Sequence, residues 1–372
     1  MKNKKILIPL ILILLAVIIV GIIIYPKKKE PEVIKIGAIL PLTGPAALPG
    51  KHILNGLMIS ELSNNNKINL IIEDSKSSPK DGLFAFNKLY NIDKINILII
   101  SLSAVTLSIL PHLSEKKIPT FITLSNYPDI AMQSEWAFRF FINSTEEGKL
   151  VSEFLLKNNK KNIGILHMND EGSLGSVNSF KKSYIENGGK IRFVETFDVN
   201  QKEFKNIAVK VVNWNVDAIV AIGYGPALGT LIFQLREARV NVPIISTTPL
   251  GAYDAQKAAR DAMFTEVYYI VPSFEVNKED TLIKSFINLY QQKYGEIPDF
   301  LGAYGFDLGN LIAWVIEQSD DKFEAKKFIN KVYQYSGKGV TGFIRVDPKT
   351  REILSNLVIV TNKDKNFRKV FP

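Results

Sequence analysis

Residues 34–56 read IKIGAILPLTGPAALPGKHILNG, and they predict one strand–loop–helix unit. An Ile-rich run ends at Leu40, a loop of small residues and prolines spans residues 41–50, and an amphipathic helix follows. The run is apolar at nearly every position instead of alternating, which is typical of a parallel strand covered on both faces. Because ligands bind beyond the carboxyl ends of such strands, we expect the loop to face a cleft. Thr43 in this loop either donates to a ligand or only shapes the turn.

The same unit repeats in two series along the chain. Strands are predicted at residues 34–40, 68–73, 95–100 and 120–123, and again at 163–167, 190–196, 218–222 and 244–246. Two such series predict an α/β fold with two doubly wound lobes of parallel sheet. After residue 271 the pattern becomes mostly helical, with two last strands at 342–346 and 353–361. We expect this third segment to complete the two lobes, because it has too few strands to form another.

The N-terminal residues predict a membrane helix. Residues 6–25 are an unbroken apolar run with three lysines on either side, close to the ~20 residues that span a bilayer. The run is longer than a signal-peptide core and ends without a small-residue cleavage site, so we favour an uncleaved transmembrane anchor over a cleaved signal peptide. Residues 27–32 then form a charged spacer. A short N-terminal tail before a large domain usually stays in the cytoplasm, which places the body outside it.

Composition excludes several classes of function. The six Lys and two Glu of residues 1–32 supply +4 of the formal net charge of +9, and the other +5 is scattered without a basic block. This pattern argues against nucleic-acid binding. The chain has no cysteine, and therefore no disulfide, thiolate nucleophile or cysteine-ligated metal. His52, His112 and His167 lack metal-site spacing, so we expect no metal.

Two glycine motifs look like functional loops only superficially. Residues 223–229, GYGPALG, open a helix after an apolar strand, but no acidic residue stands about 20 positions later, where a dinucleotide loop has one. We interpret the loop as backbone that reaches the cleft edge, with Tyr224 available for stacking. Residues 172–176, GSLGS, carry Leu174 where a hydrolase would have its nucleophile. No nucleophile–base arrangement is found, so we expect no catalytic residue, no cofactor and no enzyme activity.

Taken in order, several stretches resemble the leucine/isoleucine/valine-binding family of ABC-transporter substrate-binding proteins, which has the type I periplasmic-binding fold. Each stretch is weak alone, and their order and spacing carry the resemblance over nearly the whole body. They are residues 34–47, 68–89, 102–121, 161–190, 217–245 (DAIVAIGYGPALGTLIFQLREARVNVPII) and 294–314 (YGEIPDFLGAYGFDLGNLIAW).

The resemblance implies two lobes joined by three crossovers, which close like a hinge on a small ligand. Lobe 1 would comprise residues 33–143 plus 272–337, and lobe 2 residues 144–271 plus 338–372. The implied protein is a monomer that captures a small organic ligand outside the cytoplasm and delivers it to the permease subunits of an ABC transporter. A ligand-sensing ectodomain of a receptor or signalling complex is the alternative for the same fold.

The resemblance also implies where the ligand binds. In family members the loop after the third strand binds the α-carboxylate of an amino acid, the end of the next strand lies beside it, and lobe 2 supplies the opposite side. With the cleft loops identified above, the expected ligand-binding residues are Thr43, Ser101, Ser103, Ala104, Ser125, Asn126, Leu174, Tyr224 and Thr248.

Two positions depart from the family pattern. Leu174 stands where the family has a tyrosine, and the acid that pairs with the α-ammonium falls at Thr247 or Thr248. An ammonium buried without a partner costs several kcal/mol. The departures therefore favour amides, carboxylates or aromatic acids, or an amine that is satisfied from elsewhere, for which Glu171 and Asp170 are candidates.

Overall fold

The computed structural model describes residues 33–319, 322–353 and 356–372. Within these ranges, no helix is both long enough and apolar enough to cross a membrane. The apolar run of residues 6–25, which we expect to be a membrane anchor, lies outside the described residues, as does the spacer of residues 27–32.

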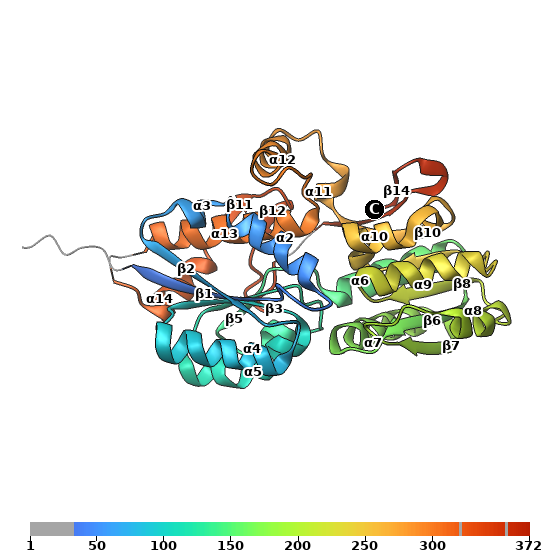
Figure 1. Cartoon of the computed structure of the whole chain (residues 1–372), viewed down its shortest axis with the longest axis horizontal. Coiled ribbons are helices and arrows are strands. Elements are labelled where there is room, and N and C mark those ends of the chain that lie inside the picture. Colours follow the sequence, from blue (N-terminus) through green and yellow to red (C-terminus); the bar gives the residue numbers. More distant parts are fainter. Residues whose placement is uncertain (1–32, 320–321, 354–355) are drawn as a thin grey trace, which may run out of the picture. The chain divides into compact units, whose positions relative to one another are not determined.

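The first lobe is built on a five-stranded sheet in which every neighbouring pair is parallel (Figure 1). Its order is β2-β1-β3-β4-β5, so the chain winds outward from β1 in both directions. The strands are β1 (Ile34–Leu40), β2 (Ile68–Asp74), β3 (Ile97–Ser101), β4 (Thr120–Thr123) and β5 (Ala137–Arg139). The carboxyl ends on either side of β1 are the place where this architecture forms a crevice.

The second lobe is built on a seven-stranded sheet of order β14-β13-β10-β9-β8-β6-β7. Its strands are β6 (Asn162–Met168), β7 (Lys190–Phe197), β8 (Ala218–Ile222), β9 (Ile244–Ser246), β10 (Val267–Pro272), β13 (Leu357–Thr361) and β14 (Arg368–Phe371). The first five are mutually parallel, whereas β13 and β14 are antiparallel to their neighbours. The second sheet therefore carries two antiparallel strands at one edge in addition to the parallel strands that we expected. Because β10 leaves the sheet toward the first lobe and β13 returns from there, β13 must run against β10.

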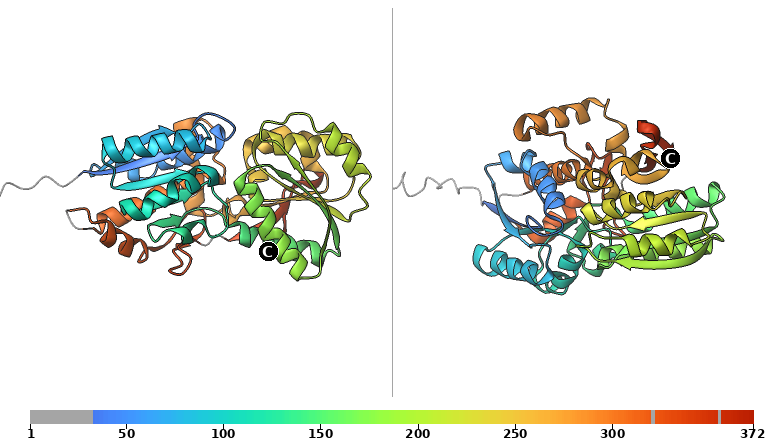
Figure 2. Two further views of the ribbon diagram at one scale, coloured as in Figure 1. Left: turned by 90° about the horizontal axis from the view of Figure 1, so that it is seen from below. Right: turned by 45° about the vertical axis from the view of Figure 1, so that its right-hand side comes forward.

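Helices cover both faces of each sheet (Figure 2). The first sheet packs α2, α3 and α11 to α14 on one face and α4 and α5 on the other. The second packs α8 to α10 on one face and α6 and α7 on the other. The helices are α2 (Ala47–Leu57), α3 (Glu61–Asn64), α4 (Pro79–Lys88), α5 (Ser103–Lys116), α6 (Ser144–Lys157), α7 (Glu171–Glu186), α8 (Lys205–Val212), α9 (Gly225–Glu237), α10 (Tyr253–Ala259), α11 (Ser273–Val276), α12 (Thr281–Tyr294), α13 (Phe300–Glu317) and α14 (Ala325–Val332).

The long helix α13 lies directly against α2, although their sequences are far apart. A Cβ atom on Gly56 would lie 2.1 Å from the carbonyl oxygen of Gly302, and one on Gly305 would lie 2.1 Å from that of Ile53. Only glycine permits this approach of the two backbones. The contact fixes the start of α13 beside the loop that follows β1.

The resemblance implies three passages of the chain between the lobes. In the structure β5 of the first sheet is followed by β6 of the second, β10 by helices of the first core, and residues 340–353 of the first core by β13. The third passage differs from our expectation, which returned the chain to the second lobe at residue 338. The apolar side chains of residues 340–353 instead join the first core: Val340, Ile344, Val346 and Ile353. Asp307 of α13 holds this segment by accepting hydrogen bonds from the backbone N–H groups of Val340 and Thr341 at 3.0 and 2.7 Å. The segment contains a short antiparallel pair, β11 (Ser336–Lys338) and β12 (Phe343–Arg345).

Candidate functional site

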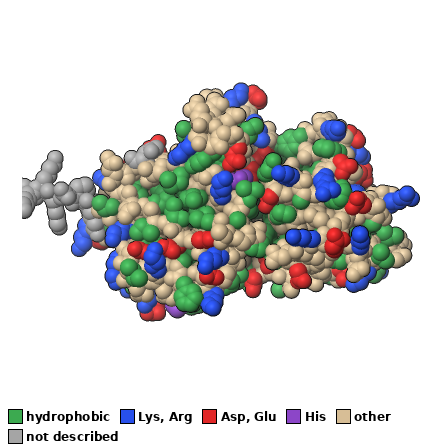
Figure 3. All heavy atoms as spheres, in the orientation of Figure 1, with side chains coloured by type: hydrophobic (Ala, Val, Ile, Leu, Met, Phe, Trp, Pro, Cys, Tyr) green, Lys and Arg blue, Asp and Glu red, His purple; other side chains and the backbone are tan. Residues whose placement is uncertain are grey.

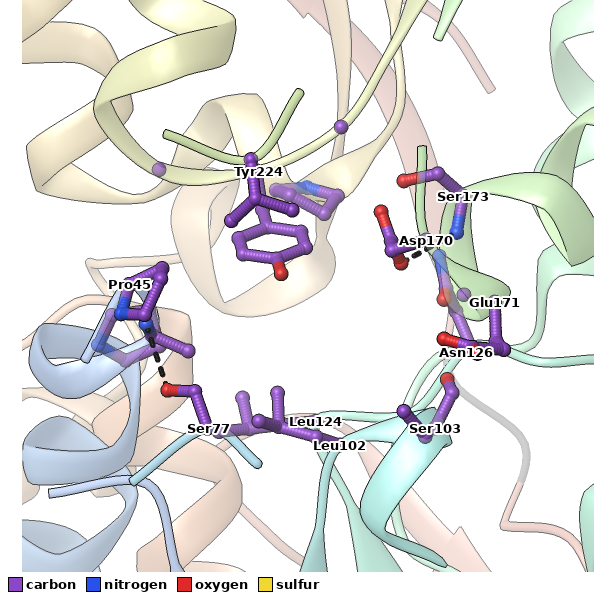
Figure 4. Close-up of a pocket in the computed structure, with 18 of the residues that line it drawn as sticks. Pro45, Ser77, Leu102, Ser103, Leu124, Asn126, Asp170, Glu171, Ser173 and Tyr224 are labelled. Atoms are coloured by element: carbon purple, nitrogen blue, oxygen red, sulfur yellow. Dashed lines mark hydrogen bonds between the residues drawn. The ribbon is translucent and has the colours of Figure 1, made fainter. Parts of the chain in front are cut away.

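A cavity of about 450 Å³ lies between the two lobes, beyond the carboxyl ends of strands from both sheets (Figure 4). Loops after β1 to β5 supply one side, loops after β6 to β9 supply the other, and the start of α13 closes one end. Its volume suits a small organic molecule. Its lining is mostly apolar, and the polar groups are Ser77, Ser103, Asn126, Asp170, Glu171, Ser173, Tyr224 and Thr247.

The first-lobe wall is formed by the ends of β3 and β4. Leu102 and Leu124 have φ values of 73° and 48°, in the left-handed region, which non-glycine residues seldom adopt and which concentrates at functional sites. These turns direct Ser103 and Asn126 to the cavity (Figure 4). The hydroxyls of Ser103 and Ser125 are 2.9 Å apart, and Asn126 donates to the hydroxyl of Ser176 at 2.8 Å.

The second-lobe wall carries the charge of the cavity. Asp170 caps α7, because its Oδ1 accepts a hydrogen bond of 3.1 Å from the N–H of Ser173. Its Oδ2 is buried and has no hydrogen-bond partner among the described residues. Burial raises the pKa of Asp170 above its ordinary value, against the hydrogen bonds from Ser173 and Gly172. Glu171, the next residue, also lines the cavity and is exposed to solvent.

Tyr224 faces these carboxylates from the loop between β8 and α9, with its hydroxyl directed into the cavity (Figure 4). Burial raises the pKa of its phenol, and the negative charges of Asp170 and Glu171 raise it further. The phenol is therefore a neutral hydrogen-bonding group at physiological pH. Among the described residues that line the cavity, none is a lysine, arginine or histidine.

The two walls come close at the start of α7. A Cβ atom on Gly172 would lie 3.0 Å from the Ser103 hydroxyl and 3.2 Å from Oδ1 of Asn126. One on Gly175 would lie 2.7 Å from Cδ of Pro128. Glycine at these positions lets the second lobe approach the ligand-facing loops of the first.

A sequence profile of the Periplasmic binding protein family matches residues 33–366. The chain belongs to this family. Its members are solute-binding proteins and not enzymes, so the resemblance inferred from the sequence, and the expectation that the protein is not an enzyme, are confirmed.

Relatives of this periplasmic binding protein are distant in sequence and close in fold. A Leu/Ile/Val-binding protein from Rhizobium johnstonii is 27% identical over 62% of this chain, and the match spans 65% of that relative's length. A leucine-binding protein from Thermotoga maritima has a TM-score of 0.83 at 22% identity, covering 91% of this chain and 98% of its own. A solute-binding protein from R. palustris, solved with benzoate, has a TM-score of 0.82 at 20% identity, covering 91% and 96%.

Four of the expected site residues line the cavity of this periplasmic binding protein: Ser103, Ala104, Asn126 and Tyr224. Asp170 and Glu171, which the sequence offered as substitutes for the missing family acid, line it as well. Ser125 lies one layer behind, fully buried, where its hydroxyl meets that of Ser103.

The other four expected residues do not reach the cavity. Thr43 turns away and donates to Oδ2 of Asp74 at 2.6 Å, so it shapes its turn. Ser101 is the last residue of β3 and is fully buried. Leu174 is 50% exposed, because the first turn of α7 points it outward. The N–H and the hydroxyl of Thr248 donate to Oε1 of Glu147, at 2.7 and 2.6 Å. The neighbouring Thr247 lines the cavity instead.

Several lining residues were missed in the sequence. Phe300 and Leu301 close one end of the cavity from the start of α13. The only local signal is the helix start at Asp299, which caps α13 by accepting from the N–H groups of Leu301 and Gly302. Pro45 belongs to the loop of residues 41–50 that we expected to face the cleft, whereas Val199 carries no signal for binding. Their role depends on how the lobes meet.

A buried ion pair supports the first-lobe wall from behind. The guanidinium of Arg139 donates to Glu352 and to the carbonyl of Tyr127, and Glu352 also accepts from Asn143. Arg139 is 0% exposed. The pair ties the loop that carries Asn126 to the first and third passages between the lobes.

The described part of the chain has no cluster of three or more acidic or histidine side chains arranged to hold a metal ion. On the face shown in Figure 3, basic and acidic side chains are interspersed, and no basic stripe crosses it.

Proposed function

We propose that this protein captures a small organic solute in the cavity between its lobes and delivers it to the permease subunits of an ABC transporter. The observation that carries the proposal is a cavity lined by both lobes, at the carboxyl ends of parallel strands, in a chain of the periplasmic binding protein family. The lining is mostly apolar with a few polar groups, as in other small-molecule sites.

Capture works by closure of the lobes. A ligand that contacts both walls at once binds the closed arrangement more tightly than an open one, and therefore shifts the protein toward it. The close approach of Gly172 to Ser103 and Asn126 supports this mechanism, because it brings the two walls within contact distance. The division into two moving lobes is part of this proposal.

The proposed ligand is amino-acid-like, an amide or a small carboxylate. The relatives named above bind leucine, isoleucine and valine, or were solved with benzoate. Ser103 and Ala104 lie in the first turn of the 14-residue helix α5, whose N-terminal N–H groups favour a carboxylate or another polar group. The proposed contacts are Ser103, Ala104, Asn126, Asp170 and Tyr224.

The proposed place of action is the outer face of the cytoplasmic membrane, with residues 6–25 as the anchor. The unbroken apolar run and the flanking lysines support the anchor. Mass spectrometry of the membrane fraction is expected to recover peptides that precede Glu30. A mature chain that starts near Glu30 and occurs only in the soluble fraction would contradict the anchor.

A thermal-shift screen tests solute capture. The purified body, residues 33–372, is screened with the common amino acids, their amides, and aliphatic and aromatic carboxylates, and hits are measured by isothermal titration. At least one compound is expected to bind with a 1:1 stoichiometry, and the tightest is called the reference ligand below. Cells that lack the protein are then expected to take up less of the labelled reference ligand. Failure of the whole panel to bind would contradict solute capture, and unchanged uptake would contradict delivery.

A further inference from the structure

We propose that Ser176 is a positioning residue that favours the closed arrangement of the lobes without touching the ligand. Its buried hydroxyl, on the second lobe, holds the side-chain amide of Asn126, on the first-lobe wall of the cavity. The inference rests on the proposed capture by closure and deepens it, because it names a residue outside the cavity that should help to set the affinity.

The hydrogen bond between these two side chains crosses from one lobe to the other. Asn126 follows β4 in the first lobe and lines the cavity (Figure 4). Ser176 lies in the second turn of α7 in the second lobe, is 2% exposed, and does not line the cavity. Nδ2 of Asn126 donates to Oγ of Ser176 at 2.8 Å. Because donor and acceptor belong to different lobes, a movement of α7 away from the loop after β4 breaks this bond.

The hydroxyl of Ser176 fixes which end of the Asn126 amide faces it. A serine hydroxyl has one hydrogen to donate and two lone pairs that accept. Ser176 donates its hydrogen to the carbonyl oxygen of Gly172 at 3.1 Å, within α7, so its oxygen is left to accept from Asn126. The NH2 end of the amide therefore faces Ser176, and Oδ1 lies on the other side. Without this partner the side chain of Asn126 loses the contact that orients it at the cavity wall.

Two glycines near Ser176 bring α7 close enough for the bond. A Cβ atom on Gly172 would lie 3.2 Å from Oδ1 of Asn126, and one on Gly175 would lie 2.7 Å from Cδ of Pro128. These positions place no side chain between the lobes, so the Ser176 hydroxyl reaches Asn126 directly. A bond made in the closed arrangement and broken in the open one raises ligand affinity, because it favours the state that binds.

Two alanine substitutions on α7 test the inference in the body, residues 33–372, which is one compact unit. Ser176→Ala should weaken the reference ligand about 3- to 10-fold in isothermal titration. Ser179→Ala is the matched control, because Ser179 lies one turn later on α7 and its hydroxyl is 3.3 Å from that of Ser144 within the second lobe. It should leave the affinity unchanged. Urea denaturation of the free proteins should give the same midpoint for both variants.

Binding kinetics and a second background separate a bond between the lobes from a general weakening of the fold. The bond forms as the lobes close on the ligand, so its loss should raise the dissociation rate, measured by stopped flow, and leave the association rate unchanged. The effect of Ser176→Ala should also disappear in an Asn126→Ala background, because the donor is then absent. A purely structural role of Ser176 predicts the same loss in both backgrounds. Where Asn126→Ala binds too weakly to titrate, the dissociation rates decide.

Unchanged affinity in Ser176→Ala would overturn the inference. An equal loss in Ser179→Ala, an equal loss in the Asn126→Ala background, or a loss carried by the association rate alone would overturn it as well. In each case solute capture still stands, because the reference ligand binds the unsubstituted protein. If no compound of the panel binds that protein, the proposed function fails together with the inference.

Discussion

The first-lobe wall and the second-lobe wall of the cavity share one architecture, because both lie beyond the carboxyl ends of parallel strands. The two walls differ in where their charged side chains lie. The first lobe places its charges behind the wall, where Arg139 and Glu352 form a buried pair, and presents Ser103 and Asn126 to the ligand. The second lobe presents Asp170, one oxygen of which has no hydrogen-bond partner in the part of the chain that the structure describes.

Because of this difference, we expect one set of charged residues to contribute to the stability of the fold and another to contribute to ligand binding. A buried charge with a partner holds the structure together, and removing one partner leaves the other uncompensated. A buried charge without a partner lowers stability but is available to a ligand. Substitutions behind the first wall are therefore expected to change the free energy of unfolding, and substitutions on the cavity surface to change affinity.

The largest effect is expected for Arg139→Met, which leaves Glu352 buried without its partner. The free energy of unfolding should fall by about 3–5 kcal/mol, measured by urea denaturation. Arg192→Met is the control, because Arg192 is exposed and donates to Asn162 at 3.0 Å, and it should change stability by less than about 1 kcal/mol. Equal effects of the two substitutions would remove the proposed contrast between the walls.

The contact between the walls is tested by Gly172→Val. The new side chain meets Ser103 and Asn126 and should hold the lobes apart, weakening the reference ligand by about 10- to 100-fold. Gly337→Val is the control, because a Cβ there meets only ordinary contacts, the nearest at 3.4 Å from the Tyr335 hydroxyl. Titration measures both, and thermal unfolding of the free proteins checks the fold. Full affinity in Gly172→Val would mean that binding does not require this approach.

A pair of serine substitutions tests which part of the first-lobe wall contacts the ligand. Ser103→Ala removes a hydroxyl that lines the cavity and should weaken the reference ligand about tenfold. Ser101→Ala removes a buried hydroxyl that has no partner among the described residues, so affinity should stay the same and stability should not fall. The reverse order of effects on affinity would place the ligand deeper along β3 than the cavity indicates.

The smallest effect is expected from pH. A ligand with a cationic nitrogen would bind the ionised form of Asp170, and burial raises the pKa of this carboxyl. Affinity for L-leucine or L-phenylalanine, whichever binds more tightly, should therefore fall as the pH drops from 7.5 to 5, by less than about tenfold. Asp170→Asn should remove this dependence. A rise in affinity toward acid pH in the unsubstituted protein would contradict a cationic partner.

The strands were predictable because each is a short apolar run with its own boundaries. β1, β4, β8 and β9 begin and end where the sequence predicts. Four strands were missed: β5, β10, β11 and β14. β5 and β14 are short edge strands of three and four residues, whereas β10 lies inside its sheet between β9 and β13. The amphipathic helix predicted after the loop of residues 41–50 is split into α2 and α3, because the chain turns at residues 58–60.

The sequence by itself determined the two α/β series, the family and the loops that reach the cleft, because hydrophobic periodicity and loop composition are local properties. It also contained both candidate acids, Asp170 and Glu171. Only the tertiary structure decided which of two neighbouring side chains faces the cavity, as with Thr247 rather than Thr248. The tertiary structure also decided that Arg139 pairs with Glu352 and that Phe300 lines the cavity. Both depend on chain segments that meet only after folding. A one-residue change in where a strand ends turns a side chain from the ligand to the core, and local sequence does not encode that position.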